Sequence, residues 1–492
     1  MPKRTTALPL VLPPGDASQP AYRQLADGLR TSILEGRLPP GTRIPATRDL
    51  ANQLRLSRGT VVSAFELLQS QGYLEARVGA GTFVTETLPE TLLQVPPSDE
   101  ERTPALANRE PCYSDFGKRI MPLKPSALRP PRPFRTNQPA PDLFPTTLWA
   151  RVSNRRLRRT RPDLLLGCDP LGYPPLRRAI ADYLRVSRGV RCTGEQVIVV
   201  SGVQEALDLV TRLLVNPGDR VCLEDPGYIG ADRIFEAHGA LITPIPVDGE
   251  GMEVPPTEYR NVRFAYTSPG HQFPLGMSMS LPRRLALLEW ARTKGALLFE
   301  DDYDSEYRYA GRPLPALQGL DRHGSVLYAG SFSKVLSPAL RLGYLVVPDG
   351  LLDVVSAIKS VISRYPPLLE SAVLCDFISE GHFGRHLRQT REVYAARLAA
   401  LRESARERLA GLLEVPPVDA GLQTVGWLAP GLDAEAAARA AAARDVEVTP
   451  VGRYSRLGMA REGLQLGFAA VDEREIRRGV RELAVALERT KT

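Results

Sequence analysis

The chain is 492 residues long, which exceeds one ordinary domain and predicts two or three. Hydrophobic residues make up 43% and charged residues 24% of the sequence, the proportions of a soluble globular protein. The net charge of +7 permits an anionic partner such as nucleic acid but does not identify one.

Cysteine usage and hydropathy exclude several classes of protein. The five cysteines are odd in number, scattered and without a CxxC pair, which argues against a disulfide framework and a structural zinc site and fits a reducing cytosol. The apolar run at residues 8–12 is too short and too rich in proline for a signal peptide. No stretch approaches the roughly 20 apolar residues that cross a bilayer. A cytoplasmic protein with no membrane partner is expected.

The first part of the chain predicts three small helices followed by a hairpin. The predicted helices lie at residues 18–36, 47–54 and 57–72, and the predicted strands at residues 73–78 and 82–85. Ser57 is a good N-cap for the third helix, and the turn at residues 79–81 contains two glycines. This order of elements is typical of a winged helix-turn-helix, an α+β fold.

Polar residues gather where the third helix begins. The hydroxyls of Ser57 and Thr60, the guanidinium of Arg58 and the free amides of the first turn would face a phosphate backbone or a major groove. Arg48 on the preceding helix and Arg77 beside the wing add positive charge. The alternative is a packing module with ordinary surface arginines, which composition alone does not exclude.

Three ordered strings favour DNA binding. They are LPPGTRIPATRDLA at 38–51, LSRGTV at 56–61 and GYLE at 72–75, and over residues 19–86 the chain closely resembles the DNA-binding domain of GntR-type bacterial regulators. The resemblance implies double-stranded DNA as a partner. It also implies that the residues in contact with DNA are Arg48, Ser57, Arg58 and Thr60 at the groove, and Gly79 in the wing.

The stretch at residues 88–134 predicts a linker. No apolar period persists there and prolines recur, in a chain whose 44 prolines exceed the usual share of about 5%. Its second half is basic, so contact with DNA is an alternative to a solvated linker. The arginine-rich run at 155–159 is expected to form a charged helix face. The predicted domains are therefore a tail at 1–16, a DNA-binding domain at 17–87 and an effector domain at 135–492.

From residue 160 onward, helical and strand patterns alternate, as in an α/β protein. The apolar strand at 197–200 feeds a helix through a turn that contains Gly202, and such a turn seats phosphate on free N–H groups. Predicted strands at 221–223, 264–267 and 296–299 also end in polar or aromatic residues. Open α/β sheets bind ligands at the carboxyl ends of their strands, so these groups are expected to converge.

The loop SFSKVLSPALRLGY at 331–344 lies between two buried strand patterns. It holds one lysine, one arginine and several hydroxyls, a set that suits a phosphorylated aldehyde. Lys334 would form the imine, while the serines and Arg341 would hold the phosphate. Alone, a lysine in a polar loop is more often a solvated surface group.

Residues at other strand ends complete the same ligand. A carboxylate at Asp301 would keep a pyridine nitrogen protonated, Tyr303 would hold a ring hydroxyl, and Tyr228 would stack on the ring. Each is ordinary by itself, since acidic loops are usually solvated and Tyr228 suits a core position. Together with Lys334 they predict a pyridoxal phosphate site.

The second half of the chain carries a broad resemblance. Its motifs are DLFP at 142–145, SGVQEALD at 201–208, EDPGY at 224–228, HQFP at 271–274, EDDYDSEY at 300–307 and the lysine loop. Residues 135–492 resemble a fold-type I aminotransferase, an α/β transferase domain with a small C-terminal α+β subdomain. Fused to the winged helix, the whole chain resembles the MocR/PdxR subfamily of GntR regulators.

The resemblance implies pyridoxal 5'-phosphate as cofactor, a homodimer, and a role for each matching residue. Lys334 is the lysine of the Schiff base, Asp301 the partner of the ring nitrogen, Tyr303 the partner of the ring hydroxyl, and Tyr228 the stacking residue. The residues expected to hold the phosphate are Val203, Gln204, Ser331, Ser333 and Arg341.

Three positions depart from the family pattern. Gly167 stands where a tyrosine usually reaches the neighbouring subunit's phosphate, and Gly230 where a GABA-responsive member has an arginine. Gln465 replaces the arginine that clamps a substrate carboxylate, and a neutral amide does not substitute for a bidentate guanidinium. Efficient transamination is therefore not expected. The residues that would compensate from the preceding loop are Arg453, Arg456 and Arg461.

These observations lead to three hypotheses. The first is a homodimeric transcriptional regulator whose aminotransferase-like domain senses pyridoxal phosphate, or an amine or amino acid, through Lys334, with vitamin B6 metabolism as a candidate pathway. The second is a working aminotransferase with an appended DNA-binding domain. The third is a repressor whose second domain serves only as a dimerisation scaffold.

Overall fold

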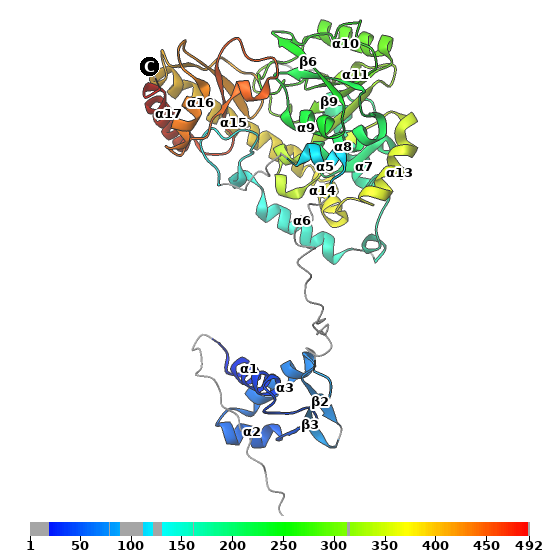
Figure 1. Ribbon diagram of the computed structural model, residues 1–492, viewed down its shortest axis with the longest axis vertical. Coiled ribbons are helices and arrows are strands. Elements are labelled where there is room, and N and C mark those ends of the chain that lie inside the picture. The colour runs from blue at the N-terminus through cyan, green and yellow to red at the C-terminus, as the bar shows by residue number, and fades with distance from the viewer. Residues whose placement is uncertain are drawn as a thin grey trace, which may run out of the picture. The chain divides into compact units, whose positions relative to one another are not determined.

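The structure is a computed structural model that describes residues 19–77, 79–88, 112–121, 130–160, 162–311 and 315–490 (Figure 1). The chain divides into two compact units, Met1–Cys112 and Tyr113–Thr492. The expected tail at 1–16, the end of the first wing strand at Val78 and most of the expected linker lie outside the described residues. None of the described helices combines the length and apolar character needed to cross a bilayer.

The N-terminal unit is a three-helix domain with a small sheet. Its helices are α1 (Ala21–Leu34), α2 (Thr47–Leu54) and α3 (Arg58–Ser70), and its strands are β1 (Arg43–Ile44), β2 (Leu74–Arg77) and β3 (Gly81–Val84). The antiparallel order is β1-β3-β2, of which β2 and β3 form the expected hairpin. The sequence did not predict β1, because two residues are too few for an alternating pattern to appear. Apolar residues of the helices and sheet share one core, so the winged helix-turn-helix prediction is confirmed.

The second unit is built on an eight-stranded sheet with the order β4-β11-β10-β9-β8-β5-β6-β7. Its strands are β4 (Val197–Val200), β5 (Arg220–Asp225), β6 (Leu241–Asp248), β7 (Gly251–Met252), β8 (Val262–Thr267), β9 (Leu297–Asp302), β10 (Val326–Ser331) and β11 (Gly343–Val346). Strands β10, β9, β8, β5 and β6 run parallel, whereas β11 and β7 are antiparallel to their neighbours. Strand β9 is longer than predicted, so Asp301 lies within it rather than in the following loop.

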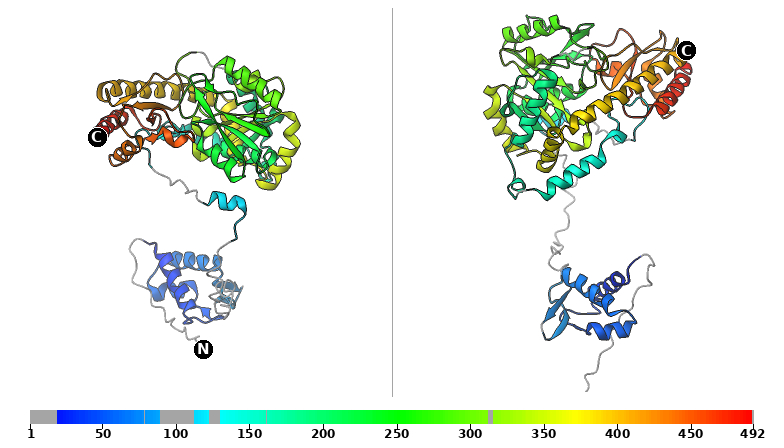
Figure 2. Two further views of the ribbon diagram at one scale, coloured as in Figure 1. Left: turned by 45° about the horizontal axis from the view of Figure 1, so that its top comes forward. Right: turned by 180° about the vertical axis from the view of Figure 1, so that it is seen from behind.

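Helices cover both faces of this sheet (Figure 2). Strand β4 gives the reason, because Val197 and Val199 pack into one buried cluster while Ile198 and Val200 pack into another. The helices around the sheet are α6 (Thr146–Arg158), α7 (Pro174–Arg188), α8 (Val203–Leu214), α9 (Ile229–Ala237), α10 (Leu281–Lys294), α11 (Leu317–Leu320), α12 (Phe332–Val335), α13 (Leu352–Ile362) and α14 (Leu368–Ser379). The predicted α/β class is confirmed.

A second, antiparallel sheet with the order β12-β13-β15-β14 forms the C-terminal subdomain. Its strands are β12 (Leu413–Glu414), β13 (Gln423–Leu428), β14 (Thr449–Pro450) and β15 (Gly463–Gly467), and its helices are α15 (His382–Arg408), α16 (Ala434–Ala442) and α17 (Glu473–Glu488). Leu464 and Leu466 of β15 belong to the same buried cluster as residues of α15, α16 and α17. Phe134 forms a bridge with Gly467, so the chain enters the domain along this sheet.

Part of the expected linker forms a short helix, α5 (Asp115–Ile120), that lies against α9 (Figure 1). The ring of Phe116 meets that of His238 edge-on with centroids 5.0 Å apart. Arg119 donates a hydrogen bond to the carbonyl of Ala237 at 3.2 Å. A helix of this length shows no hydropathy period, which is why the sequence did not predict it.

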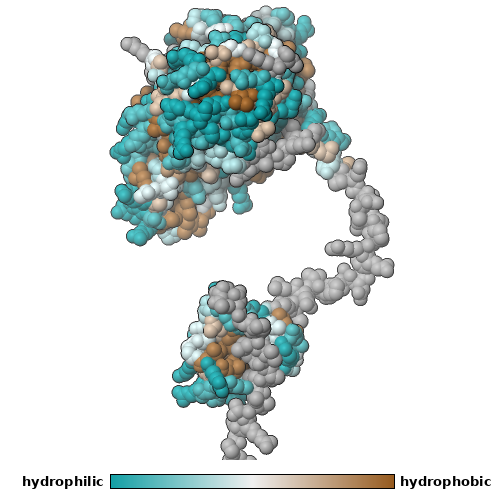
Figure 3. Space-filling view, turned by 90° about the vertical axis from the view of Figure 1, so that its left-hand side faces the viewer, coloured by the Kyte–Doolittle hydropathy of each residue, from teal (hydrophilic) through white to brown (hydrophobic). Residues whose placement is uncertain are grey.

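The face shown in Figure 3 is mainly hydrophilic, with apolar side chains scattered between polar ones. The arginine-rich run at 155–159 adds to the charged surface, as predicted for a charged helix face. Arg155 and Arg156 pair with Glu380 and Asp376 at the end of α14. These ion pairs join α6 to α14, so two charges of the run have partners within the domain.

Candidate cofactor site and DNA-binding surface

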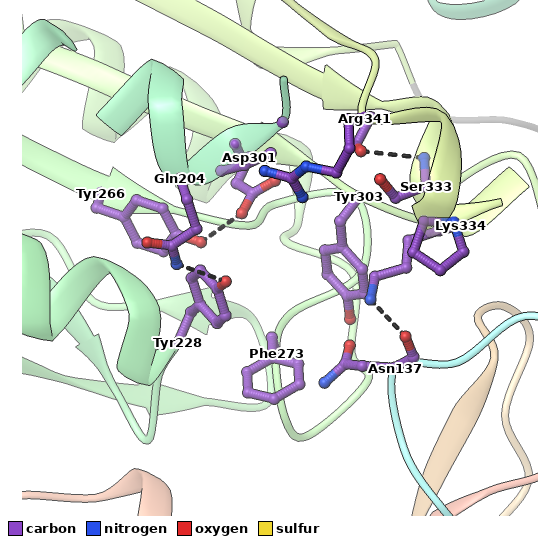
Figure 4. A pocket seen from close by; sticks show the side chains of 14 residues that line it. Asn137, Gln204, Tyr228, Tyr266, Phe273, Asp301, Tyr303, Ser333, Lys334 and Arg341 are labelled. Carbon is purple, nitrogen blue, oxygen red and sulfur yellow. Dashed lines mark hydrogen bonds between the residues drawn. The ribbon is translucent and has the colours of Figure 1, made fainter. Parts of the chain in front are cut away.

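A cavity of about 320 Å³ opens at the carboxyl ends of β8, β9 and β10 (Figure 4). Parallel strands present their carboxyl ends at one edge of a sheet, so residues far apart in the sequence meet here. Every residue predicted to hold the cofactor lines this cavity. In chain order they are Val203, Gln204, Tyr228, Asp301, Tyr303, Ser331, Ser333, Lys334 and Arg341.

Lys334 lies on α12, the single helical turn that follows β10. Its ammonium group donates a hydrogen bond to the backbone carbonyl of Asn137. Burial lowers the pKa of Lys334 to about 8, although the carboxylates of Asp304 and Asp301 act in the opposite direction. An amine with this pKa has a substantial neutral, nucleophilic fraction near neutral pH.

Asp301 lies near the end of β9, and Tyr303 separates it from Lys334 in Figure 4. One carboxylate oxygen, Oδ2, accepts a hydrogen bond from the phenol of Tyr266 at 2.6 Å. The other, Oδ1, is buried and has no partner among the described residues. Burial raises the pKa of Asp301 to about 7, with the Tyr266 hydrogen bond acting against it. An unsatisfied carboxylate oxygen at a cavity suits a cationic N–H donor such as a protonated pyridine.

The start of α8 offers hydrogen-bond donors to the same cavity. Gly202 has a φ of 145°, which favours glycine, and it turns β4 into α8. The N–H groups of Val203 and Gln204 belong to the first helical turn and have no intrahelical acceptor. The guanidinium of Arg341 lies 3.5 Å from the hydroxyl of Ser201 beside this turn. Donors in this arrangement fit a phosphate group.

An ion pair between Lys359 and Glu205 stabilises the turn between β4 and α8. Glu205 accepts the N–H of Ser201 at 2.6 Å and a hydrogen bond from Lys359 at 2.7 Å. The side chain of Lys359 is only 2% exposed, and the contact with Glu205 compensates for the water that this ammonium group gives up. On the other side of the cavity, the hydroxyl of Ser331 accepts the N–H of Ser333 at 3.1 Å. Both hydroxyl-bearing loops are therefore held in place by contacts within the domain.

Aromatic side chains form the remaining wall. The phenol oxygen of Tyr303 lies 3.0 Å from Nδ1 of His271, which also contacts the buried carboxylate of Asp304 at 2.9 Å. The hydroxyl of Tyr228 accepts a hydrogen bond from the amide of Gln204 at 2.7 Å. These contacts fix the orientation of both tyrosines, and a planar aromatic ring fits between such groups.

The sequence did not assign a role to several residues of the site. Tyr266 is buried in strand β8, as a core tyrosine would be, so only its neighbour Asp301 reveals its role. Asn137 stands just beyond the predicted linker, where no pattern marks it. His271 and Phe273 belong to the HQFP motif, which contributed to the resemblance without a chemical role.

The arginines considered as substitutes for the missing carboxylate clamp are already engaged. The pairs are Arg453 with Glu435, Arg456 with Asp232, and Arg461 with Glu414. None of these arginines lines the cavity. Gln465 is fully buried on β15. At Gly167, an added Cβ would lie 3.0 Å from the ring of Tyr365, so a larger residue requires that ring to move.

In the N-terminal unit, Ser57, Arg58 and Thr60 lie at the start of α3, Arg48 on α2, and Arg77 and Gly79 in the wing. The hydroxyl of Ser57 caps the helix by accepting the N–H of Thr60 at 3.1 Å. Arg48 and Arg58 are exposed. Arg77 differs from them, because it pairs with Glu75 and lies 5.0 Å from the ring centroid of Phe83. Gly79 has a φ of 75° in the wing turn.

We expect Arg58→Ala to weaken operator binding about 5- to 160-fold, which corresponds to about 1–3 kcal/mol for an arginine in the groove. Loss of a cation from the positive end of α3 does not destabilise that helix, so thermal stability should be unchanged. Arg77→Ala is the matched control and should cost less, because Glu75 already neutralises that charge. Fluorescence anisotropy at fixed salt measures both. Equal losses for the two variants would contradict this ranking.

Known proteins share both units. The family model for aminotransferase class I and II matches residues 135–483, and that for bacterial regulatory proteins of the gntR family matches residues 21–84. The probable rhizopine catabolism regulatory protein MocR of Rhizobium meliloti is 40% identical over 472 residues, which cover 96% of this chain and 94% of that protein. The HTH-type pyridoxine biosynthesis transcriptional regulator PdxR of Corynebacterium glutamicum is 30% identical over 487 residues, or 98% of each protein.

A solved structure supports the fold of the second unit. The α-aminoadipate aminotransferase LysN of Thermus thermophilus matches with a TM-score of 0.69 and 30% identity. The match covers 77% of this chain and 97% of that one. The fold-type I aminotransferase prediction is therefore confirmed.

The fold and these matches define a transcriptional regulator in which a GntR-type winged helix precedes an aminotransferase-like domain. The similar full-length proteins are themselves regulators. The chain belongs to the MocR/PdxR subfamily of GntR-type regulators, as the sequence predicted. Regulation is thereby supported over the alternative of an aminotransferase with an appended DNA-binding domain.

Proposed function

We propose that this regulator binds pyridoxal 5'-phosphate through Lys334 and changes its operator binding in response to the cofactor, or to an amine or amino acid that reacts with it. One observation carries the proposal. A single cavity brings together an amine of lowered pKa, an unpartnered carboxylate oxygen of Asp301 and the donors at the start of α8. Vitamin B6 metabolism is a candidate pathway, since one relative is named for pyridoxine biosynthesis.

The residues of the cavity divide the work of holding this cofactor. When bound, pyridoxal phosphate supplies an electrophilic aldehyde carbon that amines attack reversibly. Lys334 would hold that carbon, Asp301 would accept from the ring nitrogen, Tyr303 would bind the ring hydroxyl, and Tyr228 would stack on the ring. The residues left for the phosphate are Val203, Gln204, Ser331, Ser333 and Arg341.

We propose sensing rather than turnover as the role of the domain. A transaminase binds and releases carboxylate substrates repeatedly, and bidentate arginines are the usual means. Here Gln465 occupies the clamp position, and the arginines of the nearby loop are paired elsewhere. Retention of the cofactor residues together with loss of the clamp supports a domain that holds the cofactor without efficient catalysis.

Two helices connect the cavity to the chain that joins the units. Helix α8 begins at Val203 and α9 follows Tyr228, and both residues line the cavity. Farther along, Arg212 of α8 lies 5.9 Å from the ring centroid of Phe116, and His238 at the end of α9 packs against the same ring. A displacement of Tyr228 therefore has a short route to α5, which lies within the expected linker. This contact is the proposed relay between effector and DNA.

The proposed assembly is a homodimer. Leu165, Leu166 and Val361 are 67%, 85% and 84% exposed, which is unusual for apolar residues of one region. They flank the contact between Gly167 and Tyr365. The exposure of these apolar side chains supports a dimer in which a second copy would cover them, and two winged helices suit a repeated operator.

The proposal is tested by adding pyridoxal phosphate to the cofactor-free, full-length protein. Operator fragments are selected from random DNA with each form of the protein, and affinities are measured by anisotropy. We expect the affinity to change by roughly 5- to 150-fold, the usual range of coupling between two sites. Visible absorbance reports cofactor binding in the same samples. Unchanged DNA affinity with bound cofactor would refute sensing of the cofactor itself and leave an amine or amino acid as the signal, and absent absorbance would refute cofactor binding.

The same assay tests the relay through α5. Phe116→Ala removes the ring that Arg212 and His238 contact, so we expect cofactor binding to persist while its effect on operator affinity disappears. Lys118→Ala is the matched control on the same helix, because Lys118 is exposed and, among the described residues, pairs with Asp115 alone. Full coupling in Phe116→Ala would show that the signal takes another route.

A further inference from the structure

The C-terminal subdomain contains a buried amide with unmet hydrogen-bonding capacity. Gln465 is 0% exposed, and neither its Oε1 nor its Nε2 has a partner among the described residues. Buried polar groups are nearly always hydrogen-bonded in native proteins, so an unsatisfied amide calls for an explanation. A ligand that supplies both an acceptor and a donor is one.

The strand pattern places this amide on the sheet face turned away from the apolar core, although Gln465 is not among the residues that line the cavity. Side chains alternate along β15, and Leu464 and Leu466 point into the apolar core, so Gln465 lies on the opposite face. Val425 is its partner on β13, which puts Gln423 on that same face. Gln423 accepts the N–H of Asn137 at 2.9 Å, and Asn137 lines the cavity.

Backbone pairing brings the cavity wall close to Gln465. Phe134 pairs with Gly467, and the backbone of Arg135 and Thr136 covers that glycine, so the segment crosses the sheet face two residues from Gln465. The segment continues to Asn137, whose backbone carbonyl accepts the hydrogen bond from Lys334. Gln465 therefore stands beside the wall that contacts the reactive amine.

Strand β14 borders Gln465 on the side of β15 that lies opposite β13. Thr449 of β14 pairs with Gln465, and Tyr454 follows a few residues later in the chain. The ring of Tyr454 lies 5.0 Å from that of Phe273, which lines the cavity in Figure 4. Thus Gln465 is framed by neutral side chains on the subdomain face that borders the site.

The cations of the cavity already have roles in the proposed function. Among the lining residues only Lys334 and Arg341 are positively charged, and they serve the aldehyde and the phosphate. A carboxylate placed near Gln465 would have no counter-ion there and would meet Oε1 without a proton to share. A hydroxyl or a carboxamide both donates and accepts, so it satisfies both ends of the glutamine amide.

We infer that the effector is a primary amine whose distal group is an uncharged hydroxyl or carboxamide held by Gln465, and not a simple amino acid. This inference rests on the proposed function, because the amine must meet the aldehyde of the bound cofactor. Gln465 acts as the residue that sets specificity for the distal group.

The test uses the full-length holoprotein and two matched pairs of probes. They are L-alaninamide with L-alanine, and serinol with L-serine, titrated while the absorbance of the bound cofactor is followed. The neutral member of each pair should act at lower concentration. Because the free amines differ in basicity, the decisive quantity is the ratio of the affinity for the neutral probe to the affinity for the carboxylate probe in wild type, divided by the same ratio in Gln465→Arg. We expect that quotient to reach at least about tenfold, since the guanidinium restores a carboxylate clamp.

Gln465→Leu provides the second variant, because it removes the amide without adding charge to a buried site. It should lose the preference for the neutral probes and gain none for carboxylates. A wild-type preference for carboxylates, an unchanged preference in Gln465→Leu, or no response to any of the four probes would overturn the inference. Each of these outcomes leaves cofactor absorbance intact, whereas absence of that absorbance would instead overturn the proposed function.

Discussion

Lys334→Ala is expected to abolish the covalent hold of the protein on pyridoxal phosphate. Lys334 is the only lysine among the residues that line the cavity, so no neighbouring amine replaces it. After reduction with borohydride, mass spectrometry of the wild-type protein should locate the cofactor on the peptide that contains Lys334. The variant should carry none and should lose its visible absorbance on dialysis.

Lys334→Arg separates the nucleophile from its charge. Arginine keeps a cation beside Asp301 and Asp304 but stays protonated, so it does not react with an aldehyde. The arginine variant should therefore fail to retain the cofactor, as the alanine variant does. Cofactor retained covalently by either variant would show that another group holds it. If Lys334→Arg keeps non-covalently bound cofactor while Lys334→Ala loses it, the positive charge of Lys334, and not its nucleophilic amine, is decisive.

The positions of these groups followed from the sequence because they stand at strand ends. Asp301, Ser331 and Gly202 each follow an apolar run, and parallel strands bring such positions to one edge whatever the intervening loops contain. The cap at Ser57 was equally local, since a hydroxyl before an apolar helical period is enough to mark the start of α3. Local patterns with a fixed geometric consequence were thus the reliable part of the prediction.

Residues whose role depends on packing between distant segments were out of reach. Gln423 meets Asn137 only because β13 and β15 adopt a particular register beside the segment that begins at Phe134. Tyr266 reaches Asp301 because β8 lies next to β9, and the order of strands in the sheet cannot be read from the sequence. The contact of Phe116 with α9 likewise joins residues that are far apart in the sequence, so no local pattern predicts it. Sequence patterns report which side chains are polar or apolar, but not which of them become neighbours.

Asp301→Asn is expected to weaken cofactor binding about 30- to 1000-fold, or about 2–4 kcal/mol, because a buried charge-assisted hydrogen bond to the ring nitrogen is lost. The amide oxygen of asparagine still accepts from Tyr266, so the site keeps its shape. Neutralising Asp301 also removes an anion that raises the pKa of Lys334. Competitive acetylation of Lys334 in the cofactor-free protein should therefore show a pKa below about 8.

The same substitution should stabilise the cofactor-free protein. Burial raises the pKa of Asp301 from 3.8 to about 7, so the folded state favours the protonated acid more than the unfolded state does. The resulting cost of an ionised Asp301 is absent below the unfolded-state pKa, grows as the pH rises, and reaches its full value, at most about 4 kcal/mol, above the folded-state pKa.

Asparagine has no such cost, so the stability gain of Asp301→Asn should be small near pH 4 and largest above about pH 7. Denaturant titrations of both cofactor-free proteins across this range measure the difference. Weaker cofactor binding together with greater stability would mean that the fold retains a costly buried carboxylate for its ligand. A variant destabilised equally at every pH would instead assign Asp301 a structural role through Tyr266.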